Sequence, residues 1–257
     1  MNRFFSFAFS TTAVVALPLS AHSEVFAIGF DFDEDGAPLQ AGVVDLAANQ
    51  PYQNIFGPGL GLTVSTDNPS SRPLNLYNSE GTGGSDDDLE RLHGGGTSWA
   101  EGNLGSTAVG NLLIVNEDTD LDDPDDDAAG GTIRFEFDLA IQQFAFDFID
   151  MDKATDAEVI FTDNVSGSFV TIGFEEFEDG FGGIWETSGV SFGDRAGNRI
   201  EGISAEKLGL DSFDEIEFVL SSSGGIGSLF VTPVPEPSSA LLLSFSSLLL
   251  LRRHRGR

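Results

Sequence analysis

The stretch GTIRFEFDLAIQQFAFDFID, from Gly131 to Asp150, decides the fold class of this chain. Apolar residues occupy alternate positions in both of its halves, at Ile133, Phe135, Phe137 and Leu139 and again at Phe144, Phe146 and Phe148. A period of two is typical of a β-strand that buries one face and exposes the other. The stretch therefore predicts short strands whose phenylalanine-rich faces turn toward a core.

The same alternation recurs along most of the chain, at residues 25–33, 61–66, 111–117, 157–163, 167–174, 214–221 and 227–232. Clusters of Gly, Asn, Asp and Ser separate these segments, and residues 201–210 are the one place where we expect a short helix. About ten to twelve short strands predict an all-β fold, a single jelly-roll-like β-sandwich. Residues 51–106 contain glycine runs and few strands, so we expect long loops there, over one end of the sandwich.

The first 23 residues have the three parts of a secretory signal peptide. Arg3 supplies the positive charge and residues 4–19 are mostly apolar. Ala21 and Ser23 then place small residues before a cleavage point. We therefore expect export, with residues 1–23 removed from the mature protein.

The end of the chain carries a second apolar run, Ser238–Leu251. As a helix this run reaches roughly 21 Å, which is less than the ~30 Å hydrocarbon core of a membrane. Five serines weaken it further, so it predicts only marginal insertion. The arginines that follow, at positions 252, 253, 255 and 257, favour the cytoplasmic side and leave the body of the protein on the other side.

The order of Pro235-Glu236-Pro237, a short apolar helix and an arginine cluster that starts at Arg252 and Arg253 resembles the PEP-CTERM sorting signal. The resemblance covers residues 233–257 and implies an exosortase-type processing enzyme as a partner, with transient membrane insertion through the tail. It also implies a final place at the cell surface or in the extracellular matrix of a Gram-negative bacterium. A weak tail anchor without processing is the alternative.

Between these two ends lies the predicted β-sandwich domain, residues 24–232, and its composition limits its partners. Residues 24–233 hold seven basic and 41 acidic residues, a formal charge of −34. Such a surface repels phosphates and anionic lipids, which excludes nucleic acid as a partner. There is no cysteine, so disulfides, thiol catalysis and zinc–thiolate sites are absent.

Two short motifs resemble parts of esterases, but their context does not fit. The run His93-Gly94-Gly95-Gly96 matches an oxyanion motif, and G-x-S-x-G surrounds Ser191. A loop rather than a helix is expected after Ser191, and the only later histidine, His254, lies in the tail. Glu215 and Glu217 leave a glycosidase as a minor alternative, since that chemistry needs only two carboxylates. We do not expect an enzyme.

Calcium is the predicted cofactor, because the chain is rich in oxygen ligands. In FDFDEDG, Asp31, Asp33 and Asp35 alternate before Gly36, as in the first half of a D-x-D-x-D-G calcium loop. Gly42 stands where such a loop needs a bidentate acid, so a distant strand would have to complete the site. The alternative is a polar strand end whose acids are solvated.

Asp150 and Asp152 end a strand in the same manner and are predicted as further calcium ligands. Other acidic groups are Asp86-Asp87-Asp88, Asp147 and the dense run 117–127. Dense like charges repel one another unless a cation neutralises them. We expect the run 117–127 to be a calcium-ordered loop or, with slight preference, a flexible and solvated one.

The predicted function is a calcium-stabilised, carbohydrate-binding-like β-sandwich that acts among exopolysaccharides in a biofilm. Sugar rings stack on exposed aromatic side chains, and the candidates are Tyr77, Trp99 and Trp185. A purely structural acidic matrix protein without a specific ligand is the main alternative, and the glycosidase is the lesser one.

Overall fold

The computed structural model describes residues 24–32, 52–53, 60–69, 71–81 and 86–235. The predicted signal peptide and the sorting tail beyond Pro235 lie outside these residues, as do Asp33 and Asp35. Among the described residues, no helix is both long enough and apolar enough to span a membrane.

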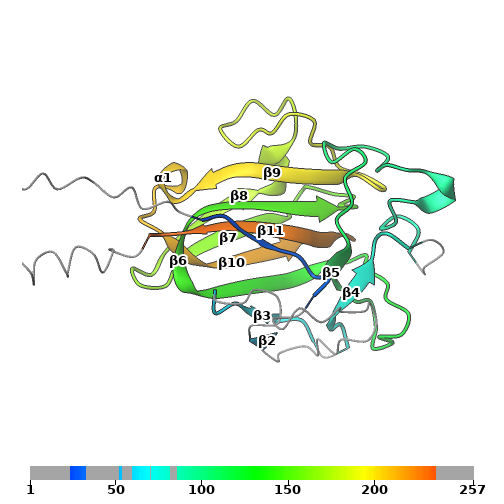
Figure 1. Ribbon diagram of the computed structural model, residues 1–257, viewed down its shortest axis with the longest axis horizontal. Helices are drawn as coiled ribbons and strands as arrows, with labels where there is room; N and C mark the ends of the chain where they lie inside the picture. The colour runs from blue at the N-terminus through cyan, green and yellow to red at the C-terminus, as the bar shows by residue number, and fades with distance from the viewer. Residues whose placement is uncertain (1–23, 33–51, 54–59, 70, 82–85, 236–257) are drawn as a thin grey trace, which may run out of the picture. The chain divides into compact units, whose positions relative to one another are not determined.

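The regular secondary structure of the described chain consists almost entirely of antiparallel strands, which confirms the all-β prediction (Figure 1). The strands are β1 (Phe26–Ile28), β2 (Tyr52–Gln53), β3 (Thr63–Ser65), β4 (Leu74–Asn78), β5 (Asn111–Val115), β6 (Gly131–Ile149), β7 (Glu158–Asp163), β8 (Ser168–Gly173), β9 (Gly197–Ser204), β10 (Phe213–Leu220) and β11 (Gly225–Pro233). The helical turns are η1 (His93–Gly95), η2 (Phe174–Phe177) and α1 (Ala205–Leu208). All the strands belong to one hydrogen-bonded antiparallel sheet that folds into a sandwich.

The long strand β6 joins the two layers of this sandwich. Its first half pairs with β10 and β3, and its second half pairs with β11 and β9. The pairing with β10 jumps from Glu136–Glu215 to Ile141–Phe213, so residues 137–140 have no partner in β10. β6 bends sharply in this region, as Figure 1 shows. The alternation predicted short strands here, and the structure has one bent strand instead.

Each layer is therefore organised around one half of β6. The first layer has the order β2, β3, β6, β10, β7, β8. The second has β9, β6 and β11, and the far edge of β11 pairs with β1 along one part and with β5 along another. β4 continues this layer beyond β5.

The phenylalanine faces predicted from the alternation meet between the layers. Phe146 of β6 packs against Phe218 of β10 with ring centroids 4.9 Å apart, and Phe148 lies 5.3 Å from Phe174 of η2. Both contacts have the edge-to-face geometry that favours aromatic pairs. These side chains are fully buried. The core is therefore where the period of two places it.

The alternation stops at the end of β6, because both faces of the strand are covered there. Asp147 and Ile149 alternate with Phe146 and Phe148 along the strand, and all four side chains are fully buried. Ile149 belongs to a second apolar cluster with Tyr77, Leu89, Trp99, Leu104, Val109, Leu112 and Ile114. Part of the long segment 51–106 thus packs on this layer, as loops but also as the unpredicted strand β4.

The predicted helix at residues 201–210 is mostly wrong. Its first residues belong to β9, a strand that the sequence analysis missed, and α1 has only four residues. The Ser204 side chain accepts a hydrogen bond from the backbone N–H of Lys207 and begins the helix. Gly209, with φ of 74°, ends it in a left-handed conformation that glycine adopts without cost.

Candidate metal centre

Acidic residues from distant parts of the chain meet at the end of the sandwich where β6 finishes (right in Figure 1). We call this group the acid cluster; its members are Asp86, Asp88, Asp125, Asp126, Asp150, Asp152 and Asp194. They come from the loop after β4, the loop between β5 and β6, the turn after β6 and the loop before β9. Carboxylate oxygens of Asp86, Asp125 and Asp126 all lie within 4.8 Å of one another.

Asn116, which is fully buried, holds the acidic loop that follows β5. Its side-chain amide donates to the carbonyl oxygen of Asp118 at 3.0 Å. Its side-chain oxygen accepts the backbone N–H of Asp125 at 3.1 Å, and its backbone pairs with Asp126. These contacts turn Asp125 and Asp126 inward, toward Asp86.

Asp150 is positioned by an unusual backbone conformation directly after β6. Its φ is 59°, in the left-handed region that Asp and Asn enter more readily than most residues. Its carboxylate accepts the backbone N–H of Arg195 at 2.7 Å. The Arg195 guanidinium in turn donates to the carbonyl oxygens of Glu90 and Arg91, which ties the loop that carries Asp86 and Asp88 to this end of the sandwich.

Burial makes these carboxyls hard to ionise. It raises the pKa of Asp126 to about 9, with a further increase from the neighbouring Asp86. Burial likewise raises the pKa of Asp150 to about 8, against a lowering by the Arg195 N–H. Asp152 has its pKa raised by burial and by a hydrogen bond to the Asp194 carboxyl. Like charges so close together require either protons or a cation.

A second, smaller group of possible metal ligands lies on the loop after β4, which also carries Asp86 and Asp88. Nδ1 of His93 is 3.1 Å from a carboxylate oxygen of Asp87 and 3.9 Å from one of Glu90. Glu90 is 1% exposed, whereas Asp87 is exposed. This group offers one nitrogen and two oxygens, while the acid cluster offers oxygen alone.

The structure brings together some of the predicted calcium ligands and separates others. Asp150 and Asp152 are in the acid cluster, beside members of the other acidic groups noted in the sequence. Asp31 lies elsewhere: its carboxylate accepts the backbone N–H of Asn111 at 2.9 Å and fills the space beside Gly110. Asp194 was missed, because it is a lone acid in a loop and carries no motif.

The aromatic residues predicted to bind sugar are buried. Tyr77, Trp99 and Trp185 are only 3%, 4% and 8% exposed. The Trp99 indole N–H donates to the carbonyl oxygen of Thr107 at 3.0 Å, and the Lys207 ammonium covers the Trp185 ring at 4.7 Å. Sugar stacking needs an open ring face, so the prediction for these three residues has to be corrected: they are packing residues.

The two glutamates considered for glycosidase chemistry lie beside a cation. Nε of Arg134 is 2.8 Å from a carboxylate oxygen of Glu217 and 3.5 Å from one of Glu215. Both carboxylates stand on β10, within the first layer. Their arrangement is that of ion-paired residues on a sheet face.

Comparison with known proteins assigns no relative to this chain. No protein-family model matches it, and no curated protein is significantly similar to it. The acid cluster and the fold around it are therefore the basis on which a function has to be inferred.

Proposed function

We propose that this protein is an exported surface or matrix protein whose β-sandwich is stabilised by calcium bound in the acid cluster. One observation carries the proposal: the carboxyls of Asp126 and Asp150, 8% and 3% exposed, are buried among other carboxyls. In the described part of the chain, no Lys or Arg side chain forms an ion pair with either of them. Buried charges are normally paired or bound to a metal.

Calcium fits this donor set better than other common ions. The cluster provides carboxylate oxygens and no nitrogen or sulfur, which favours a hard cation. The acids come from four separate segments, and calcium accepts irregular arrangements of six to eight oxygens, whereas magnesium demands a near-ideal octahedron. Bound calcium would tie the loops after β4 and β5 to the end of β6.

The location follows from the two ends of the chain rather than from the cluster. The signal-peptide pattern supports export, and the resemblance to the PEP-CTERM tail supports processing at the membrane by an exosortase-type enzyme. An acidic sandwich with a charge of −34 suits a role in cohesion of a matrix that contains divalent cations. This is the role of a structural acidic matrix protein, the main alternative to carbohydrate binding that the sequence predicts.

A calcium-titrated thermal melt with ion counting tests the proposal. A ligand at one hundred times its Kd stabilises the folded state by about 2.7 kcal/mol, or roughly 5–10 °C for a domain of this size. We expect that rise with calcium, and a smaller one with magnesium. The matched control is Asp156→Asn, since Asp156 is exposed and has the same left-handed backbone as Asp150, with φ of 68°.

The control variant should respond to calcium as the unchanged protein does, whereas Asp150→Asn should lose most of the rise. Asparagine keeps the backbone conformation and can accept the Arg195 N–H, so the variant removes charge with little else. A melting temperature that does not move with millimolar calcium, or no bound ion by counting, would show the proposal to be wrong.

A further inference from the structure

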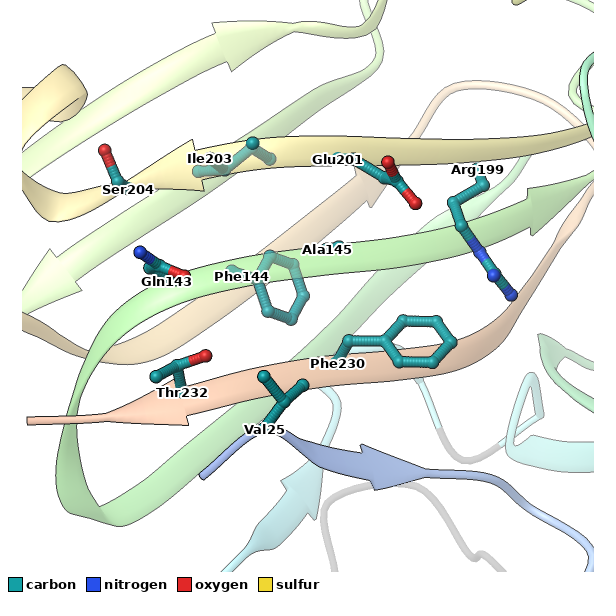
Figure 2. A pocket seen from close by; sticks show the side chains of 11 residues that line it. Val25, Gln143, Phe144, Ala145, Arg199, Glu201, Ile203, Ser204, Phe230 and Thr232 are labelled. Carbon is teal, nitrogen blue, oxygen red and sulfur yellow. The ribbon is translucent and has the colours of Figure 1, made fainter. Parts of the chain in front are cut away.

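A groove of about 440 Å³ runs over the second layer, away from the acid cluster. Figure 2 shows the labelled side chains on the neighbouring strands β9, β6 and β11, with Val25 just before β1. No member of the acid cluster lines the groove. Gln143 and Glu201, which do line it, are exposed, so the groove lies on the outer face of the layer.

Strand register arranges the groove in three rows. In the polar row, Gln143 stands between Thr232 on β11 and Ser204 on β9. In the apolar row, Ala145 lies beside Phe230. Adjacent rows are two residues apart, about 7 Å along the strand.

The third row, the ion-pair row, reaches the groove through Arg199, which lies opposite Asp147 in the strand register. Nε and Nη2 of Arg199 donate to the two carboxylate oxygens of Asp147 at 2.6 and 2.8 Å, and Asp147 is fully buried. The guanidinium also lies over the Phe230 ring, 4.4 Å from its centroid. Nη1 of Arg199 makes no hydrogen bond to the rest of the described chain.

The hollow exists because two positions in the middle of the face carry almost no side chain. Ala145 is the smallest side chain that β6 places in the groove. Gly202 follows Glu201 in β9 with φ of 73°, and a side chain added there would meet no atom within 4 Å. Larger residues surround this floor on β11 and β9, so the groove is open to a ligand that lies flat on the sheet.

The charges of the groove exclude a polyanion. Asp147 neutralises Arg199, and the exposed Glu201 leaves a surplus of negative charge. The charge of −34 on the mature chain repels anions at longer range. The groove thus presents hydroxyl, amide and guanidinium groups beside an apolar floor. Small-molecule binding sites typically combine an apolar surface with a few polar groups in this way.

We propose that this groove binds a chain of neutral polysaccharide. The apolar C–H faces of the sugar rings would lie on Ala145 and against the edge of the Phe230 ring, since the Arg199 guanidinium covers one face of that ring. Their hydroxyls would exchange hydrogen bonds with Gln143, Ser204 and Nη1 of Arg199. The three rows extend about 13 Å along the strands, which is enough for a few sugar units. The choice of polysaccharide rests on the proposed location in the matrix, but the binding does not rest on the cation.

The test is retardation of the protein in native gels that contain dextran, a galactomannan or a mixed-linkage β-glucan as neutral probes, with alginate as the anionic comparison. Gels are run with calcium and with EDTA, below the melting temperature measured in each. Ala145→Tyr fills the floor and should weaken binding more than tenfold. Gln143→Ala removes one hydrogen-bonding side chain and should weaken it about two- to tenfold. The control, Phe169→Ala, removes an exposed aromatic ring on β8, outside the groove.

The expected result is retardation by at least one neutral probe, with or without calcium, that both groove variants reduce and Phe169→Ala leaves unchanged. Circular dichroism melts of each variant confirm that the variant is folded. Retardation by none of the neutral probes, or retardation unaffected by Ala145→Tyr, overturns the proposal. Retardation by alginate alone, and only with calcium, also overturns it and points to bridging by the acid cluster instead. Loss of calcium binding with retained groove binding would reject the proposed function and leave this inference standing.

Discussion

Without calcium, the protein should become less stable as pH rises from 5.5 to 7.0. In the folded state burial holds the pKa of Asp150 at about 8 and that of Asp126 at about 9, whereas an unfolded aspartate ionises near 3.9. Between pH 5.5 and 7.0 both groups are therefore protonated when folded and ionised when unfolded. The folded state binds more protons, so the free energy of unfolding falls as pH increases.

The magnitude follows from proton linkage. Each such carboxyl lowers the free energy of unfolding by about 1.4 kcal/mol per pH unit, so the two together lower it by about 2.7 kcal/mol per unit. Over this pH range the loss is about 4 kcal/mol, a large part of the 5–15 kcal/mol by which domains are normally stable. The stability is fully present below the unfolded pKa and is lost as pH rises through the folded pKa.

The assay is urea unfolding in EDTA at several pH values across this range, for the protein and for Asp150→Asn. The variant lacks one titrating group, so its slope should be smaller by about 1.4 kcal/mol per pH unit. Repulsion among the many surface acids affects both proteins equally and cancels in the difference, and Asp156→Asn should keep the full slope. Calcium should remove the slope of the unchanged protein, because it stabilises the ionised carboxylates. Equal slopes for the protein and Asp150→Asn in EDTA would refute the assignment of Asp150 as a buried, protonated carboxyl.

Two further expectations concern the core and the tail. Phe146→Ala should lower the free energy of unfolding by roughly 3–5 kcal/mol, because the fully buried ring contacts both layers. Denaturation in urea measures this change. A loss below about 1 kcal/mol would contradict the packing described. Replacing Pro235, Glu236 and Pro237 by alanine should keep the protein in the membrane fraction of its own host, whereas unchanged release into the medium would rule out processing at this motif.

The sequence was sufficient for the parts of the fold that depend on local alternation. Phe144, Phe146 and Phe148 face the core as the period of two requires. The same period contains no information on where a strand changes partners, so the bend of β6 at residues 137–140 could not be predicted. β9 was missed because charged and glycine residues interrupt its apolar positions.

For the candidate site, the sequence showed which segments are acidic but not that these segments lie close together in the fold. Asp150 and Asp152 were predicted because they end a strand in the same manner as Asp31 and Asp33. Their neighbours Asp86 and Asp126 lie in other segments, and only the topology brings these segments together. The aromatic prediction failed for a related reason: residue type alone does not tell whether Trp99 stands on a surface or beneath a loop.

The pairing of β1 with β11 has a consequence for how the chain reaches its folded state. Phe26 lies opposite Val231, so the first strand of the domain hydrogen-bonds to the last. In the described chain β1 has no other strand partner, and it must wait until nearly the whole domain has emerged from the ribosome. Contacts so distant along the chain fold slowly. The sheet therefore cannot be completed until β11 is available for pairing. β11 ends at Pro233, two residues before the Pro-Glu-Pro motif begins.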